Sequence, residues 1–136
     1  KAFAPRLSKS PHLLSEMLLA VDFKLDTPKE VVIVVPASRN EAEPLLAKLE
    51  KSFVPNRVLV VAAEGKDLGD QAKLVPLLEG KLAQNGKATA YVCERGVCQF
   101  PTTDPDVFAE LVRKTHALTP ATGKNPVEGP VPKVSR

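Results

Sequence analysis

Two cysteines flank a short turn in the segment TAYVCERGVCQF, residues 89–100. The dipeptide Arg95-Gly96 between them predicts a two-residue β-hairpin loop, because glycine tolerates the positive φ that such loops require. Glu94 and Val97, which flank the loop, are expected to form the first cross-strand pair. The following pair is Cys93 with Cys98, at a site where Cα atoms approach to about 4.5 Å. Disulfides join Cα atoms about 4.4–6.8 Å apart, so the two sulfurs are expected to be neighbours.

The pattern leaves three states open for this pair. We expect first that Cys93 and Cys98 are small buried thiols that react slowly, since free cysteine is among the most buried residue types. The second alternative is a structural disulfide, which would constrain the unfolded chain little because its loop is short. The third is a redox pair, although active dithiols favour a C-x-x-C spacing at a helix N-terminus. Tyr91 and Phe100 are the next pair on the same face, and we expect them to be in contact.

A small-anion site is the second candidate, at Ser38, Arg39 and Asn40. These residues follow the apolar run 30–37, and open α/β sheets bind ligands at the carboxyl ends of such strands. Arg39 could hold an anion together with the N-terminus of the next helix. The alternative is that Asn40, with Glu43, only caps this helix and that Arg39 is solvated.

The other chemistry-bearing residues form no complete site. His12 and His116 are far apart in the sequence, and one cysteine pair is only half of a tetrahedral set, so we expect no metal. The chain has no G-x-S-x-G nucleophile motif, and its glycines lack the spacing of a phosphate-binding loop. We therefore expect no cofactor and no catalytic residue in this chain.

The elements that position these residues follow from the apolar patterns. Continuous β-branched runs predict buried parallel strands, and apolar residues at three- and four-residue spacing predict helices. The expected order is a helix at 10–25, a strand at 30–37, a helix at 40–53, a strand at 57–63, a helix within 71–83, the two hairpin strands, and a helix that begins at Asp104-Pro105.

This order predicts an α/β protein. One amphipathic helix precedes a β-α-β-α-β-β-α string, which is typical of a small three-layer or thioredoxin-like sandwich. The redox motif of a thioredoxin would lie between the first strand and its helix, where PASRNE contains no cysteine. We expect three segments: an N-terminal segment 1–27 with the apolar helix, an α/β domain 28–118, and a flexible tail 119–136 that is rich in proline and polar residues.

The net charge of +3 lies at the two ends of the chain. Residues 1–29 carry five basic and three acidic side chains and residues 119–136 carry three and one, whereas residues 30–118 carry eleven and twelve. Aromatic residues make up only 4% of the chain. Nucleic-acid-binding surfaces combine clustered Lys and Arg with stacking aromatics, so we expect no nucleic-acid partner. No apolar run approaches the roughly 18–20 residues of a membrane span, so we expect no membrane partner.

Several segments resemble a known family. The runs EVVIVVPA, FVPNRVLVV and LVPLLEGK, followed by GKATAYVC-x4-CQFPTTDP, are similar to the C-terminal portion of the thioredoxin-domain-containing proteins of the YyaL-type, spermatogenesis-associated family. The resemblance extends from about residue 10 to residue 118. It implies a much longer protein, with a thioredoxin-like domain, then an α/α-toroid similar to sugar epimerases, then this α/β end. The helix at 10–25 would be a remnant of the toroid, and the family's C-x-x-C and cavity residues would lie upstream.

Two hypotheses of different classes follow. The first is a non-catalytic C-terminal accessory domain of a thioredoxin-domain-containing protein, which packs through the helix at 10–25 against upstream domains or against itself. It predicts that this helix has an exposed apolar face, or that a dimer buries this face. The second is a redox or sugar-handling enzyme component that uses Cys93 and Cys98.

Overall fold

Strand β1 (Lys29–Val35) runs through the interior of a four-stranded sheet in the computed structural model, which describes residues 3–114 of the chain. It pairs in parallel with β2 (Arg57–Ala63) and antiparallel with β3 (Thr89–Glu94), which in turn pairs antiparallel with the two-residue β4 (Val97–Cys98). The strand order is β2-β1-β3-β4. The parallel β1–β2 pair and the hairpin are as the sequence predicts.

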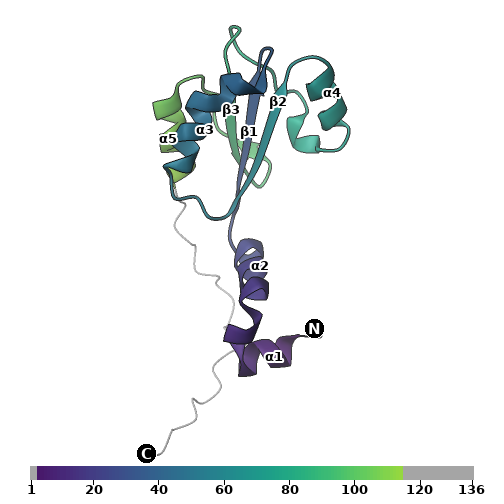
Figure 1. Ribbon diagram of the computed structural model, residues 1–136, viewed down its shortest axis with the longest axis vertical. Helices are drawn as coiled ribbons and strands as arrows, with labels where there is room; N and C mark the ends of the chain where they lie inside the picture. Colours follow the sequence, from purple (N-terminus) through teal and green to yellow (C-terminus); the bar gives the residue numbers. More distant parts are fainter. Residues whose placement is uncertain (1–2, 115–136) are drawn as a thin grey trace, which may run out of the picture.

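Helices cover both faces of this sheet (Figure 1). Helices α3 (Glu43–Glu50) and α5 (Pro105–Arg113) pack against each other on one face. Helix α4 (Lys66–Ala72) and the short 3-10 turn η3 (Pro76–Leu78) lie on the other. A strand covered on both faces needs apolar side chains on both, which explains the unbroken β-branched run of β1. The predicted α/β class, with three layers and a helix before the sheet, is confirmed.

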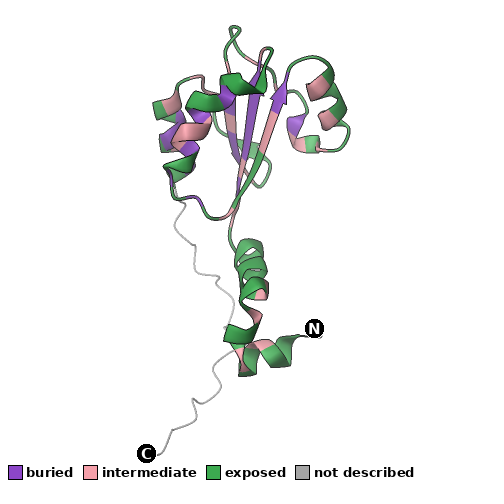
Figure 2. Cartoon of the chain, viewed as in Figure 1, coloured by how far each residue is buried: buried purple, intermediate pink, exposed green. Residues whose placement is uncertain are grey.

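Each face of the sheet buries its own apolar core (Figure 2). The residues of β1 from 31 to 35 are fully buried and alternate between the two cores. The larger core, under α3 and α5, contains Val31, Ile33, Val35, Leu45, Leu49, Val92, Phe108 and Val112. The smaller core, under α4 and η3, contains Val32, Val34, Ala62 and Leu78.

Strand β2 and helix α4 differ from the sequence-based expectations. β2 is an edge strand, and its Val58 and Leu59 are 41% and 40% exposed, so the prediction of a second buried strand holds only for its C-terminal end, where Ala62 and Ala63 are buried. α4 begins at Lys66, inside a stretch that composition alone indicates is a turn. Its first turn is held because the Asp67 carboxylate accepts the backbone N–H of Ala63. The helix expected within 71–83 is interrupted before Pro76, where the preceding residue is extended, as proline favours.

The start of α3 also differs in detail. Ser38 and Glu41, and not Asn40 and Glu43, form the capping box, and it caps the 3-10 turn η2 (Arg39–Ala42) ahead of α3. Regular α-helix then begins at Glu43, next to Pro44, as the proline predicts. Helix α5 begins as expected, because the Asp104 carboxylate accepts the backbone N–H groups of two residues in the first turn.

A helical arm precedes the sheet and extends away from it (Figure 1). It consists of α1 (Ala4–Lys9), the 3-10 turn η1 (Pro11–Leu14) and α2 (Ser15–Leu25). No residue of these three elements is buried (Figure 2). The sequence predicts one helix from Ser10, whereas Ser10 makes no capping bond, regular α-helix begins at Ser15, and α1 is an additional helix.

The domain boundaries at residues 27 and 118 stay predictions, and the tail at 119–136 lies outside the described residues. Asp26 ends α2 and β1 begins at Lys29, so the change from arm to sheet falls close to the first boundary. Within residues 3–114, no helix combines the length and the apolar character needed to cross a membrane.

Candidate functional site

The β3–β4 hairpin brings the two cysteines together. Arg95 and Gly96 have φ values of +50° and +77°, the conformation of a two-residue type I′ turn, which confirms the predicted loop. Cys93 is opposite Cys98, their Cα atoms are 3.9 Å apart, and a disulfide joins them. The expectation of two buried free thiols was wrong. Cys93 is 1% exposed, but β4 is the edge of the sheet and Cys98 is exposed.

The aromatic contact expected beside the disulfide does not form. Ala90 bridges to Thr102, so three residues of the outer segment, 99–101, face only two residues of β3, 91 and 92. This extra residue is a β-bulge, which changes the direction of side chains. Phe100 is consequently 94% exposed, whereas Tyr91 packs against the smaller core and its hydroxyl donates to the Leu82 carbonyl at 2.7 Å.

The hairpin lies at the end of the sheet from which the arm departs. Arg95 Nη2 donates to Thr27 Oγ1 at 2.8 Å, just beyond the end of α2. Cys93 is directly opposite Glu30 of β1, and the Gly96 N–H donates to Glu30 Oε2 at 3.4 Å. The turn that carries the cysteines is therefore in contact with the junction between the arm and the sheet.

A buried ion pair stabilises the same end of the sheet. Lys29 is 8% exposed, and its Nζ contacts Glu94 Oε1 and the carbonyl oxygen of Lys114, which follows α5. These contacts join the first residue of β1 to the last residue of β3 and to the end of α5. This pair could not be predicted from the sequence, because partners 65 residues apart leave no local pattern.

The anion-site candidates lie at the other end of β1. The backbone N–H groups of Ala37 and Ser38 both donate to Glu41 Oε1, at 3.2 and 2.7 Å. Arg39 donates to both carboxylate oxygens of Asp67, at 2.7 and 3.1 Å. Carboxylates of the chain itself thus occupy the groups that were expected to hold an anion. Anion binding at Ser38, Arg39 and Asn40 stays a prediction, and a ligand there would compete with Glu41 and Asp67.

These bonds give Asp67 a shifted titration. The hydrogen bonds from Arg39, and next those from the Ala63 N–H, lower its pKa from 3.8 to about 2. A carboxyl group whose pKa is lower in the folded state stabilises the fold above its unfolded pKa, and this contribution is lost as the pH falls through the folded value. The Arg39–Asp67 pair is therefore expected to stabilise the domain above about pH 4 and to lose this effect towards pH 2.

We expect Asp67→Asn to lower the melting temperature at pH 6 and to reduce the further loss between pH 4 and pH 2. Circular dichroism melts at these three pH values measure both effects. Arg39→Gln should act in the same direction, because it removes the largest cause of the pKa shift. An Asp67→Asn variant that loses as much stability between pH 4 and pH 2 as the parent chain would contradict this account.

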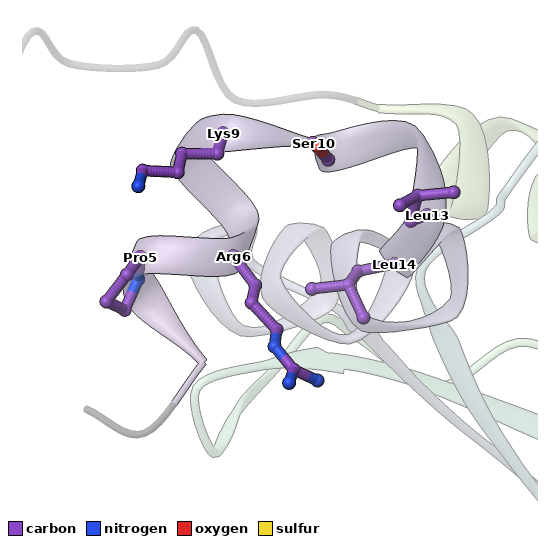
Figure 3. Close-up of a pocket in the computed structure, with 6 residues that line it drawn as sticks. All are labelled: Pro5, Arg6, Lys9, Ser10, Leu13 and Leu14. Carbon is purple, nitrogen blue, oxygen red and sulfur yellow. The ribbon is translucent and has the colours of Figure 1, made fainter.

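The described residues contain no metal-binding cluster, but they line a hollow outside the sheet. In residues 3–114, no group of three or more His, Cys, Asp or Glu side chains could hold a metal ion. A hollow of about 500 Å³ lies between α1 and η1. It is lined by Pro5, Arg6, Lys9, Ser10, Leu13 and Leu14 (Figure 3), all of them exposed or half-buried residues of the arm.

The fold and the hairpin define a small α/β sandwich domain with a cross-strand disulfide. The chain is 32% identical over 111 residues to human spermatogenesis-associated protein 20, and 28% identical over 113 residues to the rat and mouse proteins of that name. These matches include 82–83% of this chain but only 14% of each relative. The chain is thus homologous to one segment of much longer proteins. No family model and no solved structure matches it.

Proposed function

We propose that the chain is the C-terminal accessory domain of a longer thioredoxin-domain-containing protein, and that its role is to pack against the upstream part of that protein. Its relatives are about seven times longer than the matched segment, which supports a role within a larger chain. The observation that carries the proposal is the exposure of the arm. Its apolar residues are not buried against the domain that follows.

Helix α2 exposes large apolar side chains that its own domain leaves uncovered. None of its eleven residues is buried. The exposed ones are Leu18, Leu19, Val21, Phe23 and Leu25, with exposed fractions from 37% to 78%. Several large apolar side chains exposed on one short helix are typical of an interaction site in a folded protein.

The apolar residues of α2 lie on all sides of the helix. Successive residues of an α-helix are about 100° apart, so Leu19 and Val21 point in nearly opposite directions. A helix that is apolar all round is typical of the interior of a larger protein, where neighbours enclose it. This pattern favours a position of α2 among other helices, as expected for a remnant of an α/α-toroid. It does not favour docking of α2 on one flat surface.

The sandwich itself we assign to the thioredoxin-like folds. The support is its element order, β-α-β-α-β-β-α, with a parallel β1–β2 pair, an antiparallel hairpin and helices on both faces. The turn after β1, where a thioredoxin carries its dithiol, contains no cysteine. The accessory role therefore does not depend on dithiol chemistry at that position.

Hydrogen exchange in the chain alone and in the longer protein tests the proposal. The amides of α2 should exchange at least tenfold more slowly in the longer protein, because enclosed helices open rarely. The amides of β1 serve as the control and should be protected in both. Equal exchange of α2 in the two proteins would contradict the proposal.

Substitutions on opposite sides of α2 refine this test. In the longer protein, Leu19→Glu and Val21→Glu should each lower the melting temperature by several degrees, because each would bury a charge. Leu19→Met is the matched control and should have little effect, because it keeps an apolar side chain of similar volume. Sensitivity at only one of the two apolar positions would indicate docking on a single surface and would contradict enclosure.

A further inference from the structure

We propose that the hairpin disulfide is a thiol–disulfide exchange site, in which the thiolate of an external dithiol attacks Sγ of Cys98. The proposal is independent of the accessory role. The attacked residue is on β4, the outer strand of the hairpin, and the exchange needs no contact with the arm. It is carried by the unequal exposure of the two cysteines and by the short loop that they close.

Access selects the sulfur that is attacked. Exchange requires a thiolate to reach one sulfur of the disulfide directly. Cys93 lies on an interior strand and is 1% exposed, whereas Cys98 is exposed on the edge strand β4. An incoming thiolate can therefore reach the Cys98 end, and the Cys93 sulfur is the leaving group. Exposed disulfides are the class that undergoes reversible exchange, in contrast to enclosed structural ones.

The exchange balances in two steps. In the first, the attacking thiolate forms a bond to Cys98 Sγ, the Cys93–Cys98 bond breaks, and Cys93 leaves as a thiolate that takes a proton from solvent. In the second, the other thiolate of the dithiol attacks the dithiol sulfur that is bonded to Cys98 Sγ. A disulfide forms within the dithiol, and Cys98 is released as a thiolate. The hairpin disulfide gains two electrons, and the dithiol loses two electrons and becomes a disulfide.

The hairpin does not depend on the disulfide for its fold. The disulfide joins residues only five positions apart, so it restricts few conformations of the unfolded chain. The strands are held independently, because Gln99 donates its N–H to the Val92 carbonyl at 2.9 Å and Glu94 pairs with Val97 across the turn. Reduction can therefore occur in the folded protein, with the turn retained.

The surroundings of Cys98 favour a protein as the source of the dithiol. Val97 and Phe100, which flank Cys98 in the sequence, are 75% and 94% exposed. The outer edge of β4 has no neighbouring strand among the described residues. An extended segment of another protein could pair with this edge and cover the two apolar side chains, which would place its thiolate beside Cys98.

Two single-cysteine variants of the full chain test which sulfur is reachable. Cys93→Ala leaves Cys98, which should react with an aromatic disulfide reagent at least about tenfold faster than the Cys93 left by Cys98→Ala. Peptide mapping of the unmutated chain after brief treatment with glutathione gives a second measurement, and the adduct should be on Cys98. Equal rates in the two variants, or an adduct on Cys93, would overturn the assignment.

Reduction of the unmutated chain tests the exchange itself. Mass tagging of thiols should show two new thiols after treatment with dithiothreitol or with a reduced thioredoxin, while circular dichroism still reports the folded state. Reduction by the thioredoxin identifies a protein dithiol as a competent source. Reduction by dithiothreitol alone supports exchange with small dithiols and overturns the protein source. A disulfide that is reduced only after denaturation would overturn the proposal.

Discussion

Replacing Phe108 by alanine is expected to destabilise the domain by about 3–5 kcal/mol, the usual cost of deleting a fully buried aromatic ring. Phe108 is 0% exposed and packs in the larger core between α5 and the sheet. Single domains of this size are stable by only about 5–15 kcal/mol, so the variant should lose a large share of its stability. Denaturant titration followed by circular dichroism measures the change.

Phe100 provides a matched control for this substitution. It is also a phenylalanine, but it lies in the β-bulge and is 94% exposed. Phe100→Ala should therefore change the free energy of unfolding by no more than about 0.5 kcal/mol. Comparable losses in the two variants would mean that the packing described for α5 is wrong.

The second large effect is expected at the buried ion pair. Lys29→Met keeps the length of the side chain but removes the cation that contacts Glu94 and the Lys114 carbonyl. Removing one member of a buried pair typically costs about 3–5 kcal/mol, because the other charge remains in a poorly solvated place. The Glu94 side chain retains 18% exposure, so we expect a loss somewhat below this range, about 2–3 kcal/mol.

Lys48→Met is the control for the ion pair. Lys48 joins α3 to α5 through Asp106, but its side chain is 41% exposed and that of Asp106 is 82% exposed. Solvent screens such pairs, so the free energy of unfolding should barely change. The double variant Lys29→Met, Glu94→Leu should recover part of the loss, because it removes both members of the pair and not one alone. An undiminished loss in the double variant would contradict this explanation.

The features that depend on local pattern could be predicted from the sequence. A β-branched run identified β1, and Arg95-Gly96 identified the turn and, through it, the pairing of Cys93 with Cys98. Asp104 followed by Pro105 identified the start of α5. In each case the decisive interactions are between residues within a few positions of each other, so the sequence alone contains the geometry.

The features that were missed depend on contacts across the fold. Strand β2 has an apolar composition, but its exposure follows from a place at the edge of the sheet, which composition does not reveal. The expected burial of Cys98 was wrong for a similar reason, since its exposure depends on what covers β4. The Arg39–Asp67 and Lys29–Glu94 pairs join residues 28 and 65 positions apart. Only the three-dimensional arrangement brings such partners together.

The contact between Arg95 and Thr27 gives the arm and the cysteine hairpin a common neighbourhood. We expect a structure that surrounds α2 in a larger assembly to lie next to the hairpin turn and to border the approach to Cys98. The width of that approach would then depend on how the assembly closes around the arm. Tight closure would admit small reductants and turn away bulky ones, so assembly itself would select the electron donors of the hairpin.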